Sequence, residues 1–203
     1  MAGCDCNIEI KNREESRVLI ILLCINALMF VVEMTLGIIS ESTALIADSM
    51  DMLADAIVYG IGLYAVGRPA LLKIKAAHTS GVFQIILGLS VSVDIVRRLI
   101  WGSEPESLLM LSIGLLALIA NLICLVLISK HRDGEVHMRA SWIFSKNDVI
   151  ANIGIIVGGG LVCLLDSRFP DLIIGIMISA LVIRGGIHIL KNAHQEKRLQ
   201  TGE

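Results

Sequence analysis

Three aspartates share one face of a stretch that is otherwise apolar. The stretch "ALIADSMDMLADAIVYGIGLYA" carries Asp48, Asp51 and Asp55 at spacings of three and four residues, which places their carboxylates along one stripe of a helix. An aspartate at the centre of a membrane-spanning helix costs about 2.5 to 3.5 kcal/mol. Carboxylates this close need a cation, protons or a basic partner. The stretch therefore predicts a cation or proton site, and a buried salt bridge to Lys146 or Arg184 is the structural alternative.

A second polar group interrupts a later apolar stretch. In "SWIFSKNDVIANIG", Asp148 and Asn152 are four residues apart, and Ser145 precedes Asp148 by three. Carboxylate, amide and hydroxyl oxygens that converge from two helices are ligands for a divalent cation. The two stretches together predict an oxygen-rich cation site between two helices.

The elements that carry these residues are predicted to be membrane-spanning helices. Hydrophobic residues make up 55% of the 203 residues and charged residues 18%, and the mean hydropathy is +0.79. These values exclude an ordinary soluble domain. A helix needs about 20 apolar residues to cross a bilayer. The sequence predicts an all-α membrane protein with six such helices, at residues 17–39, 43–67, 77–100, 108–130, 142–165 and 171–193.

The predicted organisation is a single six-helix domain over residues 17–193, with an N-terminal tail at 1–16 and a short C-terminal tail at 194–203. Twelve Lys and Arg residues fall on the side of the two tails and three on the other side. The positive-inside rule then predicts that both termini are cytoplasmic. The pattern is consistent with a bacterial inner membrane.

Whether Cys4 and Cys6 in the N-terminal tail bind metal is left open.

The segment "SESTALIADSMDMLADA" resembles the second-helix motif of the cation diffusion facilitator family of metal transporters. That motif has a small-residue entry, then Ala-Leu-x-Ala-Asp, then Asp or His four residues before a second Asp. The order of six spans, Glu33 in "FVVEMTLGIIS" and Asp148 extend the resemblance over nearly the whole chain. The resemblance implies a carrier and not an enzyme, which exchanges a divalent metal for protons, has no permanently bound cofactor, contacts membrane lipid and binds no nucleic acid.

The resemblance also implies the metal ligands. In the family, two residues of the second helix and two of the fifth form a tetrahedral site in mid-membrane. Asp51 and Asp55 fall on the second-helix pair, and Asp148 falls on the second position of the fifth-helix pair. The first position of that pair is Phe144, which cannot ligate a metal.

The fourth ligand therefore has several candidates. Asn147 is favoured slightly, and Ser145, Asn152 or water are the alternatives. Imidazole suits zinc and its neighbours, whereas carboxylate and amide oxygens suit harder ions such as Mn, Fe(II) or Mg. The predicted substrate is a divalent transition metal, with Zn, Co, Cd, Fe and Mn all open. Glu33 and Asp94, each inside a span, either line the ion path or are paired structurally.

Family members commonly carry a cytoplasmic C-terminal domain that helps them dimerise, and this chain is predicted to lack it. A homodimer is nevertheless expected, and it would rest on the spans. Gly81, Gly88 and residues 158–160, which are all glycine, would permit close helix approach between protomers or within one protomer. The alternative function is a transport-inactive membrane protein of the same fold that senses metal or depends on a partner chain.

Overall fold

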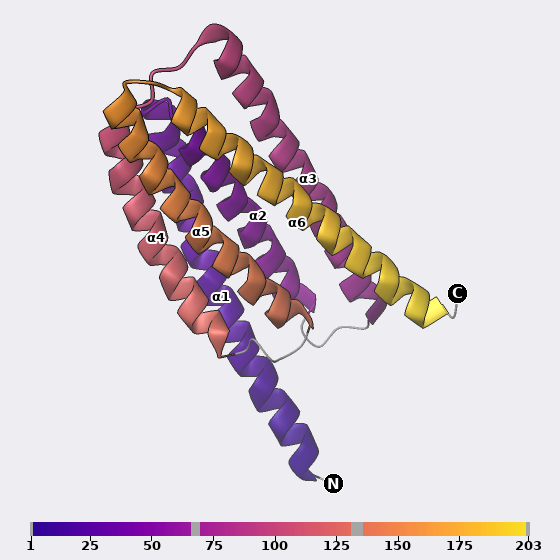
Figure 1. The fold of residues 1–203 in the computed structure, drawn as a ribbon. Coiled ribbons are helices and arrows are strands. Elements are labelled where there is room, and N and C mark those ends of the chain that lie inside the picture. Colours follow the sequence, from indigo (N-terminus) through magenta and orange to yellow (C-terminus); the bar gives the residue numbers. More distant parts are fainter. Residues whose placement is uncertain (1, 66–69, 131–135, 202–203) are drawn as a thin grey trace.

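The part of the chain that the computed structural model describes forms six α-helices and is all-α, as predicted (Figure 1). The structure describes the backbone of residues 2–65, 70–130 and 136–201, and the side chains of residues 13–64, 71, 72, 74, 75, 77–130, 142 and 145–198. The helices are α1 (Ala2–Ile39), α2 (Thr43–Ala65), α3 (Ala70–Trp101), α4 (Ser107–Ser129), α5 (Val136–Leu165) and α6 (Phe169–Thr201).

Five of the described helices, namely α1, α3, α4, α5 and α6, are long and apolar enough to cross a membrane. The helix α2 has 23 residues, which is long enough to span. It is not among the five because Asp48, Asp51 and Asp55 interrupt its apolar sequence. The chain is therefore an integral membrane protein whose second helix carries three aspartates and no basic residue.

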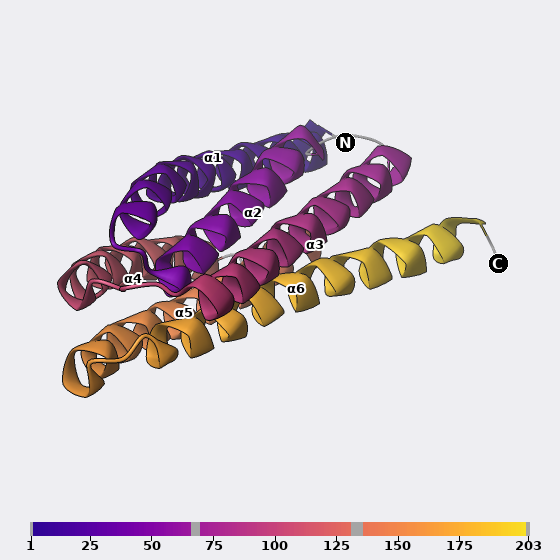
Figure 2. The same ribbon diagram turned by 90° about the horizontal axis from the view of Figure 1, so that it is seen from above.

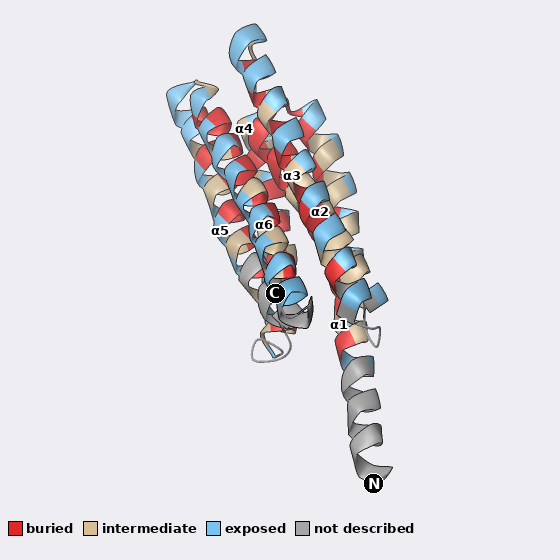
Figure 3. Cartoon of the chain, turned by 90° about the vertical axis from the view of Figure 1, so that its right-hand side faces the viewer, coloured by how far each residue is buried: buried red, intermediate tan, exposed pale blue. Residues whose placement is uncertain are grey.

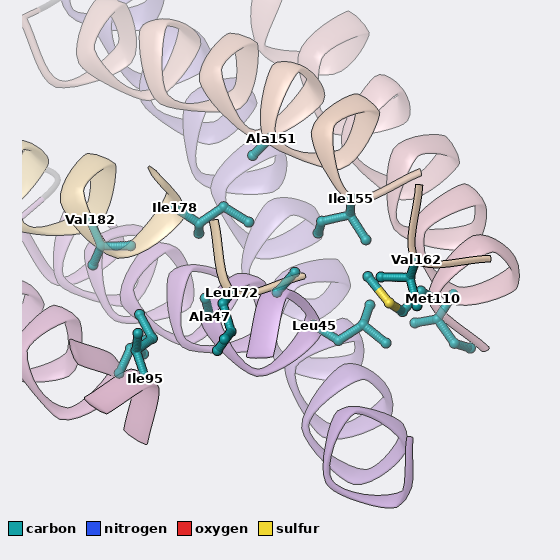
Figure 4. Close-up of a cluster of buried hydrophobic side chains, with 13 residues drawn as sticks. Leu45, Ala47, Ile95, Met110, Ala151, Ile155, Val162, Leu172, Ile178 and Val182 are labelled. Carbon is teal, nitrogen blue, oxygen red and sulfur yellow. The ribbon is translucent and has the colours of Figure 1, made fainter. Parts of the chain in front are cut away.

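The packing of α2 explains how so acidic a helix fits in the bundle. It contacts each of the other five helices, and α3 and α6 run side by side along one flank of it (Figures 1 and 2). The largest cluster of buried apolar side chains joins α2 to α3, α4, α5 and α6, with Leu45, Ile155 and Ile178 at most 1% exposed (Figure 4). Buried positions face inward and exposed ones outward (Figure 3). The exposed side chains include many large apolar residues, such as Leu28, Val93 and Leu164, as expected of a surface that contacts lipid.

Glycines let α3 and α6 approach closely within one protomer. A Cβ added to Gly81 would lie 2.9 Å from the Gly186 carbonyl oxygen, and one added to Gly88 would lie 2.5 Å from Cγ1 of Ile183. Any side chain at either position would therefore push the two helices apart. Of the two readings of these glycines, the structure supports packing inside the protomer.

The N-terminus of α2 is fixed by a carboxylate from another helix. Asp171, at the start of α6 and fully buried, accepts hydrogen bonds from the Ser42 hydroxyl (2.6 Å), the Thr43 N–H (2.7 Å) and the Ala44 N–H (3.0 Å). The Ser42 hydroxyl in turn accepts from the Leu45 N–H at 3.2 Å. The carboxylate thus satisfies helix N–H groups that have no partner inside α2, and its charge suits the positive end of the helix dipole.

A second contact holds the turn between α1 and α2. Arg98 of α3 donates to Asp94 at 2.6 Å and to the backbone carbonyl of Glu41, and Arg97 also pairs with Asp94 at 2.6 Å. Asp94 is therefore paired structurally, which decides between the two readings of this residue. Glu41 has φ of 51°, a left-handed conformation that the turn requires.

Candidate metal centre

The aspartates of α2 meet residues from α1 and α5 around one small pocket. The pocket is lined by Asn26 of α1, by Asp48, Asp51, Met52 and Asp55 of α2, and by Asp148 of α5. The i, i+4 spacing of Asp51 and Asp55 places both on the face that turns toward α5. The two stretches that the sequence analysis singled out therefore do come together, as predicted.

The carboxylates at this pocket are buried and no basic side chain lines it. Asp48, Asp55 and Asp148 are 1%, 2% and 7% exposed, whereas Asp51 is partly buried. The Asp148 carboxyl interacts electrostatically with those of Asp51 and Asp55. The residues that line the pocket include no Lys, Arg or His. Several acidic groups thus share one low-dielectric space, and no described residue that lines it supplies a countercharge.

The salt-bridge alternative is not supported. Lys146 is exposed, and its ammonium lies 6.0 Å from the centre of the Trp142 ring, a cation–π arrangement. Arg184 is also exposed. Neither residue lines the pocket, so neither offsets the charge of the aspartates.

The carboxylates differ in the hydrogen bonds that they receive. Asp55 accepts from the Tyr59 hydroxyl at 2.9 Å, and this hydroxyl lies 3.5 Å from that of Ser145. No donor in the described part of the protein reaches either oxygen of Asp48 or of Glu33, although Glu33 of α1 is fully buried and interacts with Asp48 electrostatically. Two carboxylates cannot bond to each other, because neither donates, so a shared proton or a cation is needed between them.

The residues predicted as fourth ligand take different positions. Asn147 is partly buried and is not among the residues that line the pocket. Asn152 donates to the Asp148 carbonyl at 2.8 Å, and Ser145 faces Tyr59. The side chains of Phe144, Cys4 and Cys6 lie outside the described residues.

The sequence analysis missed one residue that lines the pocket, which is Asn26. A signal for it was present: Asn26 is an amide inside an apolar span and lies seven residues, or about two turns, before Glu33. Polar residues within spans usually face the interior of the bundle. Two such residues on one face of α1 indicate that this face points to the acidic stripe of α2.

The carboxylates are not yet at ligand spacing. Within the described residues, no three His, Cys, Asp or Glu side chains are arranged closely enough to hold a metal ion together. To hold one, the carboxylate side chains would have to change rotamer and turn toward a common point. The arrangement can hold a cation through oxygen ligands or, without one, share protons among its acids.

The fold and this pocket define a helical membrane protein with buried acidic residues at its core. The family model for the cation efflux transmembrane domain matches residues 19–70 and 71–196. The chain belongs to this family, and the resemblance to cation diffusion facilitators is confirmed.

Characterised relatives are metal transporters. The chain is 26% identical to the zinc transporter ZitB of Yersinia pseudotuberculosis, over 89% of this chain and 62% of the relative. It is 33% identical to the vacuolar zinc transporter ZRC1 of Saccharomyces cerevisiae, over 59% of this chain and 30% of the relative. It is 23% identical to the cadmium, cobalt and zinc/H(+)-K(+) antiporter of Bacillus velezensis, over 80% of this chain and 56% of the relative. The matched region therefore spans 30 to 62% of these relatives.

Proposed function

We propose that this chain carries divalent transition-metal cations out of the cytoplasm in exchange for protons. The observation that carries the proposal is the pocket itself, in which four carboxylates from two helices meet with no basic side chain. Buried acids with no basic partner among the described residues that line their pocket offset the cost of burial when they hold a cation or share protons. The names of the relatives, which include zinc transporters and a metal/H(+)-K(+) antiporter, support the same reading.

In the proposed exchange, Asp51, Asp55 and Asp148 ligate the metal. A dication on the cytoplasmic side displaces the protons of these acids, because an adjacent positive charge favours the carboxylate form. When the pocket opens to the other side and the metal leaves, the three acids cannot all remain charged in a low dielectric and take protons back. Because the acids interact, the cluster as a whole takes up and releases the protons, and no proton belongs to one residue.

The proposal includes the setting of the domain. All six helices cross the membrane, with α2 shielded from lipid by its neighbours, and both termini are cytoplasmic. The membrane is a bacterial inner membrane, and the working unit is a homodimer. The substrate is drawn from Zn, Co, Cd, Fe and Mn.

The test is uptake of Zn, Co, Cd, Fe(II) and Mn into proteoliposomes that contain a pH-sensitive dye. The proposal predicts flux of at least one metal with opposite proton movement, which Asp51→Ala abolishes. Asp166→Asn is the matched control, because Asp166 is an exposed aspartate in the turn after α5 and Asn tolerates its left-handed conformation of φ 46°. Metal flux without proton movement would contradict the exchange.

The second candidate is a metal-sensing or partner-dependent protein. It is favoured by the absence of a ready-made triad of ligands among the described side chains and by Phe144 at a position where the family places a ligand. It predicts that the purified chain binds metal but gives no flux with any of the five metals.

A further inference from the structure

Asn26 of α1 is held in one orientation at the pocket. The side chain is 1% exposed and lines the space between the aspartates. Its NH₂ group donates to the Leu22 carbonyl at 2.9 Å and approaches the Cys124 sulfur at 3.9 Å. The Leu22 carbonyl can only accept, so the amide must turn its nitrogen, and not its oxygen, toward Leu22.

This orientation leaves the amide oxygen without a donor. No group in the described part of the chain donates to Oδ1 of Asn26. A buried acceptor without a partner costs about 1 to 3 kcal/mol. The other polar residues at the pocket are carboxylates, which in their charged form cannot supply a hydrogen bond. The oxygen is therefore a buried acceptor on a residue beside the carboxylates, and a cation held by them would give it a partner.

The proposed metal site lacks a fourth ligand, and the structure offers Asn26 for it. Asp51, Asp55 and Asp148 provide three carboxylates, whereas Phe144 has no donor atom and Asn147 does not line the pocket. We propose that Oδ1 of Asn26 is the fourth ligand of the transported cation, so that α1 takes part in the site together with α2 and α5. The inference rests on the proposed function and specifies the ligand set of the same pocket.

Three other buried amides show why position is decisive. Asn152 of α5, Gln84 of α3 and Asn121 of α4 each have an amide oxygen without a donor among the described residues. None of them lines the pocket, and the NH₂ group of Asn152 bonds to the carbonyl of Asp148 on its own helix. Asn26 is the amide that combines an unpartnered oxygen with a place beside the carboxylates.

The ligand set has a consequence for the choice of metal. Three carboxylates and one amide make an all-oxygen site, which suits Mn²⁺ or Fe²⁺ better than a site with imidazole does. Replacement of Asn26 by His would bring a nitrogen ligand to the same place. We expect Asn26→His to raise the affinity for Zn²⁺ relative to Mn²⁺.

The experiment is isothermal titration calorimetry of the full chain in detergent, with Zn²⁺ and Mn²⁺ as separate probes. Asn26→Leu keeps the size of the side chain and removes the oxygen, so we expect it to weaken metal binding by about 10-fold or more. Asn26→Asp restores an oxygen and should bind at least as tightly as the parent. Gln84→Leu is the matched control, since it removes a buried, unpartnered amide outside the pocket and should bind like the parent.

A spectroscopic readout separates ligation from packing. The visible bands of bound Co²⁺ respond to the number and kind of ligands, so they should change in Asn26→Leu and Asn26→His and remain as in the parent in Gln84→Leu. A thermal melt of each variant without metal checks that it is folded.

The outcomes separate this inference from the proposed function. If the parent binds neither metal, the proposed function fails. If the parent binds metal and Asn26→Leu binds it equally well with unchanged Co²⁺ bands, the role of Asn26 is overturned while the function stands. If Asn147→Ala weakens binding and Asn26→Leu does not, the fourth ligand is Asn147.

Discussion

Asp171 and Asp48 are equally buried carboxylates with opposite surroundings. Asp171 is fully buried and accepts three hydrogen bonds at the start of α2. Asp48 lies in α2, a few residues after this bonded start, and is 1% exposed. It accepts no hydrogen bond from the described residues. The hydrogen bonds of the Asp171 carboxylate link α6 to the start of α2. The Asp48 carboxylate has no hydrogen-bond partner among the described residues of the folded chain. A buried polar group without a partner is expected where a ligand binds.

The comparison indicates how to separate structural from functional acids in one membrane domain. Burial alone does not distinguish them, and neither does the residue type. The distinction lies in the donors nearby: the N–H groups at a helix start supply Asp171, whereas Asp48 faces Glu33 and the other pocket acids. Variants at the start of α2 and variants at the pocket should therefore affect different properties.

The largest effect is expected for Asp171→Ala. Loss of the carboxylate leaves the Ser42 hydroxyl and the N–H groups of Thr43 and Ala44 without their acceptor, and it also removes a link between α2 and α6. We expect the free energy of unfolding to fall by about 3 kcal/mol or more. Thermal unfolding in detergent measures it. An unchanged melting temperature would show that the bonds at this end contribute nothing, and the comparison would fail.

Asp55→Ala and Asp148→Ala should show the converse behaviour. Each removes a proposed metal ligand, and we expect the affinity for metal to fall by about 100-fold, or about 2.7 kcal/mol. Without metal, Asp148→Ala should not lose stability, because a buried acid is removed. Asp55→Ala should lose at most about 1 kcal/mol, because it leaves the Tyr59 hydroxyl without its acceptor. Calorimetry with Zn²⁺ and Mn²⁺ gives the first quantity and thermal unfolding the second. A loss of stability like that of Asp171→Ala would make these acids structural.

Asp48→Asn tests the same comparison at the other carboxylate. It neutralises Asp48, which accepts no hydrogen bond from the described residues. The new amide would carry no charge and could donate to Glu33, so we expect the metal-free protein to gain about 1 to 2 kcal/mol. Asp171→Asn, at the carboxylate that is fully bonded, is the matched variant and should lose stability. If Asp48→Asn also destabilises the fold, Asp48 has structural partners after all.

The smallest effect is expected for Tyr59→Phe. The Tyr59 hydroxyl donates to Asp55 at 2.9 Å, and its loss frees the carboxylate to rotate. We expect metal affinity to fall by about 5-fold, equivalent to about 1 kcal/mol. Titration of the variant with Zn²⁺ measures this change. Affinity equal to the parent would mean that the hydrogen bond does not orient Asp55.

Much of the fold could be predicted from the sequence. The six helices cover the predicted spans to within about two residues, because a bilayer requires runs of about 20 apolar residues. The helices α1 and α6 also extend into the predicted tails, over residues 2–16 and 194–201, which the apolar pattern did not indicate. The meeting of α2 and α5 was predicted too, since Asp51, Asp55 and Asp148 have no other place to be buried. The ligand roles of these residues and of Asn147 stay predictions.

What the sequence did not reveal depends on contacts between distant segments. Nothing in "FPDLII" indicates that Asp171 bonds to the first residues of α2, because the two segments lie more than 120 residues apart. The place of Asn26 at the pocket depends on the rotation of α1 against α2. The roles of Gly81 and Gly88 were left open, since a small residue permits close approach to any helix and does not specify which.

The central claim is that the acids of the pocket hold a metal ion. Equilibrium binding of Zn²⁺ and Mn²⁺ to the purified chain, compared with the triple variant Asp51→Ala, Asp55→Ala and Asp148→Ala, tests it most directly. The account predicts that the parent binds at least one of these ions within the bundle and that the triple variant, still folded, loses that binding. A parent that binds neither ion, or a triple variant that binds as the parent does, would contradict it.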